Sequence, residues 1–282
     1  MPSAKRGNRR GERLASLLFA AVTAAISVPG ALAAQQAAPP EKPPTAFLPA
    51  PQQYGLCLDQ ARKDPKAAYE QATLWRSLGG GFPADHCAAV ALIGLKRYAE
   101  AASQLETMAG AMMRADAELR GDALAQAGQA WLLAGKPDSA KADFDGALQY
   151  KPGDIEILVD RAEAYALSGR FFDAIDDLSR VLAVAPKRTD ALIYRASAYR
   201  QTNSLDLALA DVDAALAIEP NSVTGLLERG NIRGMRGELA GAQADWKRVA
   251  TLAPNSQEAH AAEDNLAHLA EEAQDKPAPK AR

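Results

Sequence analysis

Histidine and cysteine are scarce in this chain of 282 residues, which has three of the first and two of the second. His260 and His268 lie eight residues apart on one expected helix, too far for ligands one turn apart, and no glutamate-containing metal motif surrounds them. The glycine run 79–81 precedes Phe82-Pro83 and lacks the lysine and hydroxyl residue of a phosphate loop. No serine has the context of a nucleophile elbow. We therefore expect no catalytic residue, no metal site and no cofactor.

An excess of positive charge is also missing. The formal net charge is −3, and without residues 1–33 it becomes about −7, with 27 lysines and arginines against 34 aspartates and glutamates. A mildly acidic chain without a basic stripe is a poor candidate for binding nucleic acid or an anionic membrane surface. No stretch after residue 33 is apolar enough to span a bilayer, so we expect no membrane insertion once the first segment is removed.

The first 33 residues have the pattern of a secretory signal. Five basic residues lie between Lys5 and Arg13, an apolar stretch runs from Leu14 to Val28, and Ala31-Leu32-Ala33 offers small residues for cleavage. The pattern predicts cleavage after Ala33 and a periplasmic or secreted protein. The alternative is an uncleaved signal that stays as an anchor.

Both cysteines follow this segment. In an exported protein, an isolated pair such as Cys57 and Cys87 favours a disulfide, because the spacing fits neither a zinc site nor a redox motif. A redox-active pair is the alternative. Closing a loop of this size stabilises a fold by about 3 to 4 kcal/mol in the chain-entropy estimate.

From Gly121 to Ser256 the sequence repeats every 34 residues, four times without an insertion. Each unit contains two helical patterns separated by a slot that holds a glycine or asparagine, and each ends in a proline. The slot residues are Gly135, Gly169, Asn203 and Gly237, and the prolines are Pro152, Pro186, Pro220 and Pro254. Glycine and asparagine tolerate the left-handed conformation that a helix C-terminus often requires. A period of this length is typical of a solenoid of stacked units.

The repeated residues resemble the tetratricopeptide repeat (TPR). The first unit carries Leu124, Ala127, Gly128, Trp131, Ala140, Phe144, Ala147 and Pro152; the second Leu158, Ala162, Tyr165, Ala174, Leu178, Val181 and Pro186; the third Leu192, Ala196, Tyr199, Ala208, Val212, Ala215 and Pro220; the fourth Gly230, Ala242, Trp246 and Pro254. Arg233 departs from the pattern, which usually has an aromatic residue there. The resemblance implies an all-α, right-handed superhelical solenoid of helix-turn-helix repeats. It also implies that small residues such as Gly128 and Ala140 face each other where the two helices of a unit cross.

The complete organisation follows from these patterns. We expect a signal peptide (1–33), a proline-rich disordered leader (34–53), an N-terminal helical pair (54–81), a degenerate repeat (82–120), four repeats (121–154, 155–188, 189–222 and 223–256), a C-terminal cap helix (257–274) and a disordered tail (275–282). The disulfide would fasten the helical pair to the degenerate repeat. The cap helix would turn Ala261, Leu266 and Leu269 inward.

Four aspartates follow the same period, at Asp143, Asp177, Asp211 and Asp245, and three arginines do so at Arg161, Arg195 and Arg229. A metal or catalytic row is one interpretation. Opposite charges in a constant register favour ion pairs or caps between helices, and we expect exposed pairs that contribute about 0 to 1 kcal/mol each.

The family resemblance implies an inner face, lined by the first helix of each unit, that binds extended or helical segments of other proteins. Its expected residues are an acidic row (Asp122, Glu156, Asp190), an aliphatic row (Ala125, Val159, Ile193, Leu227) and a polar row (Gln129, Glu163, Ser197, Asn231). The lysine, arginine and asparagine of the family's carboxylate clamp are not reproduced, so we expect a partner segment that is apolar with some basic residues. The alternative is that the aliphatic row packs against neighbouring repeats.

The sequence therefore predicts a non-catalytic scaffold or adaptor of the cell envelope that binds protein partners. A carrier or sensor of a small or saccharide ligand is the alternative function, and an enzyme is a third.

Overall fold

The computed structural model describes residues 50–112 and 116–275. The expected signal peptide, the leader up to residue 49 and the tail from residue 276 lie outside the described residues. The described ranges form thirteen helices and no strand. The helices are α2 (Ala50–Lys63), α3 (Pro65–Ser77), α4 (Gly81–Gly94), α5 (Tyr98–Ala111), α6 (Ala117–Leu133), α7 (Pro137–Tyr150), α8 (Ile155–Leu167), α9 (Phe171–Val184), α10 (Thr189–Gln201), α11 (Leu205–Ile218), α12 (Val223–Met235), α13 (Leu239–Leu252) and α14 (Gln257–Asp275).

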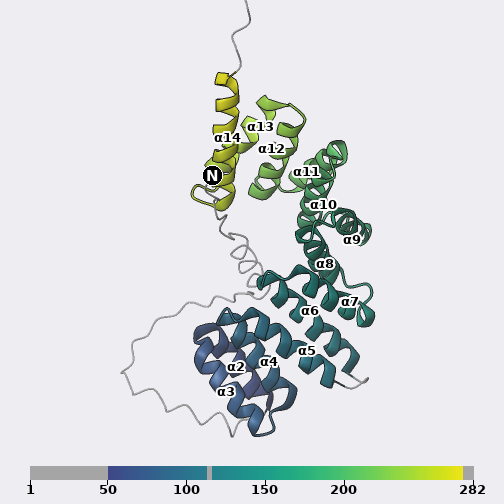
Figure 1. Ribbon diagram of the computed structural model, residues 1–282, viewed down its shortest axis with the longest axis vertical. Helices are drawn as coiled ribbons and strands as arrows, with labels where there is room; N and C mark the ends of the chain where they lie inside the picture. Colours follow the sequence, from purple (N-terminus) through teal and green to yellow (C-terminus); the bar gives the residue numbers. More distant parts are fainter. Residues whose placement is uncertain (1–49, 113–115, 276–282) are drawn as a thin grey trace, which may run out of the picture. The chain divides into compact units, whose positions relative to one another are not determined.

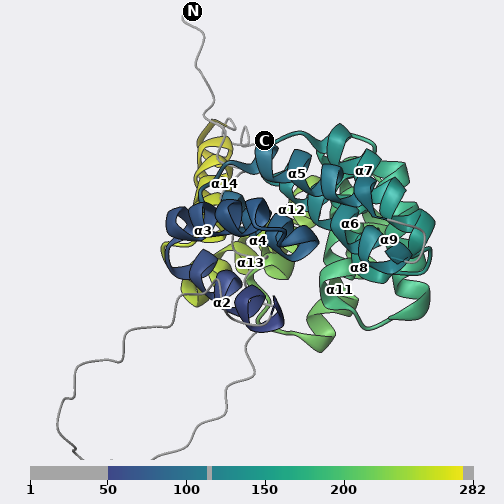
Figure 2. The same ribbon diagram turned by 90° about the horizontal axis from the view of Figure 1, so that it is seen from below.

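The helices belong to two units, one ending at Gly153 and one beginning at Asp154. Within each unit consecutive helices pack against each other in helix-turn-helix pairs (Figures 1 and 2). The chain is thus an all-α solenoid of helical repeats. None of the helices in the described ranges is both long enough and apolar enough to cross a membrane.

The ends of the first helices follow from local chemistry. The four predicted slot residues all have positive φ, at 71° for Gly135, 75° for Gly169, 59° for Asn203 and 78° for Gly237. Glycine lacks the Cβ atom that opposes this conformation, and asparagine tolerates it better than most residues. These four predicted helix ends are confirmed.

In the first and fourth repeats, the glycine of the first helix lies against an aromatic ring of the second helix where the two cross. A Cβ atom on Gly128 would be 2.6 Å from the Phe144 ring, and one on Gly230 would be 2.5 Å from the Trp246 ring. Both distances are shorter than any tolerated carbon contact. The sequence predicts that small residues let the two helices approach closely. In these two repeats the glycine also leaves space for a large aromatic ring.

Two helices begin earlier than predicted. Helix α2 begins at Ala50, inside the range assigned to the leader, with Pro51 in the first turn, where a proline needs no hydrogen-bonding N–H. Helix α6 begins at Ala117, inside the range assigned to the degenerate repeat. Residues 117–120 include good helix formers and no proline, whereas the later repeats begin after a proline-containing turn.

The predicted disulfide between Cys57 and Cys87 is present and joins α2 to α4. A second connection lies beside it, because His86 accepts or donates hydrogen bonds on both ring nitrogens. Nδ1 is 2.7 Å from the Tyr54 hydroxyl of α2, and Nε2 is 2.6 Å from the Gln126 side-chain oxygen of α6. Burial lowers the pKa of His86, while the hydrogen bond with Gln126 acts in the opposite direction. Helix α2 is therefore joined to α4 by a covalent bond, and His86 of α4 links α2 and α6 through hydrogen bonds.

Helix α14 covers the end of the second unit. Ala259 and Ala262 are buried, and Leu266 and Leu269 pack against the core formed by α11, α12 and α13. The inward residues thus include Ala262, whereas Ala261, which the sequence placed inward, is only half-buried. The polar remainder of the helix gives the last repeat a solvent-compatible outer surface.

The periodic charges form ion pairs in the second unit. Arg161 binds Asp177 through two bonds of 2.7 Å, Arg195 binds Asp211 at 2.7 and 2.8 Å, and Arg229 binds Asp245 at 2.9 and 2.7 Å. The prediction of paired charges is confirmed for these three aspartates. The expectation that the pairs are exposed is wrong, because all three aspartates are buried. The exception to pairing with an arginine is Asp143.

Candidate partner-binding face

The residues predicted to bind a partner lie on the first helices of the four repeats. Asp122, Ala125 and Gln129 are on α6 in the first unit, and the remaining eight are on α8, α10 and α12 in the second. In the second unit α8 contacts α10, α10 contacts α12, and α12 contacts α14 (Figure 1). The face formed by α8, α10 and α12, here called the inner face, is therefore continuous within that unit.

The aliphatic row is mostly enclosed by protein. Val159 and Ile193 are 7% and 6% exposed, while Ala125 and Leu227 are half-buried. The end of the Ile193 side chain lies 3.4 Å from the position that a Cβ atom on Gly225 would occupy, and Leu227 packs against the core of the last repeats. This burial supports the alternative that Val159 and Ile193 pack against neighbouring repeats.

The acidic row is engaged by basic residues that the sequence did not associate with it. Arg188 donates to Glu156 at 2.8 Å and to Asp190 at 2.9 Å, and so joins acids of two successive repeats. In the first unit Lys151 donates to Asp122 at 2.7 Å. Both basic residues lie in the turns that follow α7 and α9, and a turn position gives no helical periodicity from which to infer such a contact. The negative edge is therefore partly neutralised.

The residues of the polar row differ in their burial and in their contacts. The Asn231 side-chain oxygen accepts hydrogen bonds from Trp246 at 3.1 Å and from Asn265 of α14 at 2.9 Å, so this residue ties the last repeat to the cap helix. Gln129 and Ser197 are half-buried. Asn231 thus has an intramolecular role that its sequence position did not indicate.

Glu163 on α8 is a half-buried acid of the inner face with a strongly raised pKa. Burial raises its pKa to about 7, and the negative charge of Asp160 adds to the rise. Tyr194, on the next first helix, has its pKa raised to about 12 by burial and by the charges of Glu163, Asp190 and Asp160. The three acids and the phenol therefore act on one another across α8 and α10. A cation placed here would relieve the repulsion and favour the ionised form of Glu163.

Two apolar side chains lie one helical turn after residues of the polar row. Leu167 follows Glu163 by four residues, and Met235 follows Asn231 by four, a spacing that places each pair on one side of its helix. Leu167 is 36% exposed and Met235 is 52% exposed. The predicted aliphatic row includes the buried Val159 and Ile193 but not these two residues, which occupy the last turn of α8 and α12. Their shared position within the 34-residue period is the signal that could have found them.

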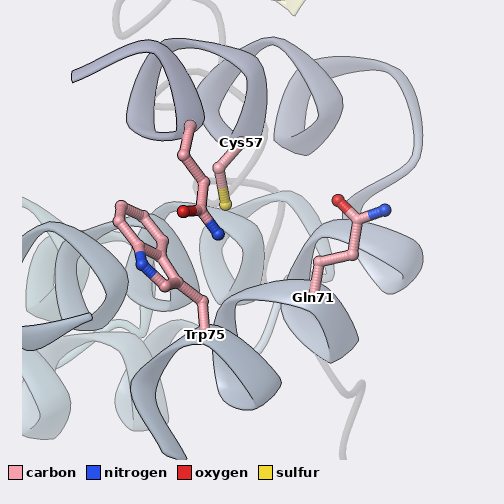
Figure 3. A pocket seen from close by; sticks show the side chains of 4 residues that line it. Cys57, Gln71 and Trp75 are labelled. Atoms are coloured by element: carbon pink, nitrogen blue, oxygen red, sulfur yellow. The ribbon is translucent and has the colours of Figure 1, made fainter. Parts of the chain in front are cut away.

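A small cavity lies beside the disulfide in the first unit. Cys57 of α2 and Gln71 and Trp75 of α3 line it together with Gln53 (Figure 3). Its volume of about 20 Å³ is enough for roughly one water molecule. Among the described residues no three histidine, cysteine, aspartate or glutamate side chains come together as a metal site.

The chain matches no family model and no curated protein. Among solved structures, it is similar to MamA 41-end from Desulfovibrio magneticus RS-1, with 18% identity, coverage of 66% of this chain and 97% of that chain, and a TM-score of 0.53. The structure named MamA RS-1 ArsTM double mutant matches with 19% identity, 64% and 93% coverage, and the same TM-score of 0.53. At these identities the similarity concerns the fold.

A third similar structure is the first TPR of Spaghetti (RPAP3) bound to the HSP90 peptide SRMEEVD. It matches with 25% identity over 43% of this chain and 93% of that chain, at a TM-score of 0.39. At so low a score, its bound peptide has no bearing on the present chain.

Proposed function

The chain has the tetratricopeptide-repeat fold, and from that premise we propose that it is a non-catalytic scaffold that binds another protein on the inner face of α8, α10 and α12. The partner contributes an extended or helical segment with basic and apolar side chains. The arrangement around Glu163 carries this proposal. A half-buried acid whose pKa is raised by burial and by the negative charge of Asp160 gains a favourable contact when a lysine or arginine approaches.

Leu167 and Met235 supply the apolar part of this surface. Each keeps a large fraction of its side chain exposed at the C-terminal end of a first helix. Apolar side chains of a partner would remove this area from water, at about 25 cal/mol for each Å² buried. The buried Val159 and Ile193 would support the surface from below.

Photo-crosslinking in cells tests the location of the binding surface. A photoreactive residue in place of Met235 should give one dominant crosslinked protein, identified by mass spectrometry. The matched control is Leu207 on the second helix α11, which is 54% exposed and lies off the inner face. The same crosslinked protein recovered equally from both positions would contradict a binding surface on the inner face.

The pKa of Glu163 predicts how binding depends on pH. Binding of a cationic segment requires the ionised carboxylate, and the group has a pKa of about 7 in the free protein. Affinity should therefore rise between pH 6 and pH 8, and Glu163→Gln should abolish this rise. Titration calorimetry with the partner protein that crosslinking identifies, at constant ionic strength, measures both effects.

We also propose that the protein is exported and works in the cell envelope. The signal-like segment over residues 1–33 and the Cys57–Cys87 disulfide support this, because disulfides persist in oxidising compartments. N-terminal sequencing of the protein from cell fractions tests the proposal. Mature protein that begins at Ala34 in the envelope fraction is expected, and full-length protein confined to the cytoplasm would contradict it.

A further inference from the structure

Two half-buried arginines of the second unit, Arg195 and Arg229, each connect two repeats. Arg229 binds Asp245 in its own repeat and also donates to Asp213 of the preceding repeat at 3.0 Å. Arg195 binds Asp211 and also donates to Ser179 of the preceding repeat at 3.1 Å. One guanidinium thus satisfies an acid on its own second helix and a polar group on the second helix before it.

In the first unit the same two positions are acids, but the arginine is missing. Asp143 corresponds to Asp245, and Ala127 stands where the later repeats have an arginine. Glu106 on α5 corresponds to Asp213 once the five extra residues of the degenerate repeat are taken into account. Two carboxyl groups therefore remain without the cation that lies between their counterparts.

Asp143 is buried and Glu106 is half-buried. Asp143 is 9% exposed, and its Oδ2 atom is buried without a hydrogen-bond partner. Trp131 of α6 donates its indole N–H to Glu106 Oε1 at 2.7 Å, which satisfies only one of the acceptors. Two unprotonated carboxylates offer no donor to each other, so a buried acceptor stays unsatisfied at considerable cost. One proton on the pair supplies the missing donor and removes one of the charges.

The charged groups nearby are few. Glu106 is the charge that acts on Asp143 from α5, and α6 presents Trp131 and Ala127. Lys136 lies over the Trp131 ring, 4.7 Å from its centre. On α7 itself Lys141 is paired with Asp145 at 2.6 Å.

We propose that Glu106 and Asp143 form a proton-binding site, in which one shared proton holds α5 and α7 together across α6 and whose ionisation loosens this part of the first unit. The site takes the place of the arginine bridge of the later repeats. It makes the packing of these helices sensitive to pH, whereas a guanidinium makes the equivalent packing of α11 and α13 insensitive.

The direction of the effect follows from linkage. Burial first, and then the negative charge of Glu106, raise the pKa of Asp143 to about 7. The folded protein therefore holds the proton more tightly than the unfolded chain, in which the pKa of aspartate is near 3.8. The stabilisation is fully present below about pH 4, decreases as the pH rises toward 7, and is absent above that pH.

Hydrogen exchange on the full chain tests the proposal. Between pH 5 and pH 8, amide protection factors in α5, α6 and α7, corrected for intrinsic exchange, should fall at least about tenfold in the wild type. Asp143→Asn keeps the shape, provides a permanent donor to Glu106 and removes the titration, so its protection factors should not show this fall. Glu118→Gln is the matched control, because it removes an exposed carboxyl group from α6.

The comparison with Asp143→Asn separates this site from His86, which also titrates in the first unit and acts in the opposite direction. A second measurement is independent of stability. The side-chain carboxyl carbon of Asp143, followed by NMR, should titrate near pH 7. Equal pH profiles of protection in the wild type and Asp143→Asn, or titration of the Asp143 carboxyl group below pH 5, would overturn the proposal.

Discussion

At the scale of single residues, burial decides what each charge contributes. Asp177 shows the contrast, because it accepts from two arginines of different exposure. Arg161, with 15% of its side chain exposed, binds it with two bonds of 2.7 Å, whereas Arg180, 52% exposed, makes one bond of 3.3 Å. Removing a buried partner leaves an uncompensated charge in a medium of low polarity. An exposed partner is replaced by water.

The substitution Arg161→Ala should therefore lower the free energy of unfolding by about 3 kcal/mol. Arg180→Ala removes an arginine from the same carboxylate and should cost less than about 1 kcal/mol. Chemical denaturation of the two variants and the wild type measures the difference. Equal losses would mean that the burial of Arg161 has no energetic consequence.

At the scale of helices, the crossing within a repeat obeys a size rule. Repeats with glycine in the crossing position of the first helix have a large ring on the second, as in Gly128 with Phe144 and Gly230 with Trp246. Repeats with alanine there have an aliphatic residue instead, as in Ala162 with Leu178 and Ala196 with Val212. The total volume at the crossing is thus kept roughly constant, as close packing requires.

The rule predicts compensation between two substitutions. Gly230→Ala brings a methyl group within 2.5 Å of the Trp246 ring and should cost about 1 to 3 kcal/mol beyond the helix preference for alanine. In the background of Trp246→Leu, the same substitution should cost nothing or stabilise the protein. A double-mutant cycle by denaturation measures the coupling. Additive effects of the two substitutions would refute the size rule.

These helices also show which features could be predicted from the sequence and which could not. The ends of the first helices depend on one residue each, so Gly135 and Asn203 were enough to predict them. Arg188 also binds Glu156, and Asn231 also binds Asn265; these partners are about 30 positions away, and their side chains meet only after the repeats stack. Val159 and Ile193 are buried for the same reason. The period predicts which residues are equivalent, and stacking decides which of them reach solvent.

At the scale of the whole molecule, the two units have different properties. The first contains the disulfide, the His86 bridge and the pair of buried acids at Glu106 and Asp143. The second contains three arginine–aspartate ion pairs, the cap helix and the inner face with Glu163. The proposed binding surface is thus on the unit whose repeats are fastened by permanent charges.

Each unit therefore lends itself to a separate experiment. Substitutions on the inner face change the second unit without touching the disulfide or the acid pair. Loss of binding in such a variant, with unchanged helix content, reports on the surface and not on folding.

The most direct test of the proposed scaffold is the affinity of the purified full chain for the partner segment identified by crosslinking. Glu163→Lys reverses the charge at the centre of the inner face and should weaken binding by at least about tenfold, or 1.4 kcal/mol. Leu207→Asp on α11 should leave the dissociation constant unchanged. A dissociation constant that Glu163→Lys does not alter, in a correctly folded variant, would contradict the account.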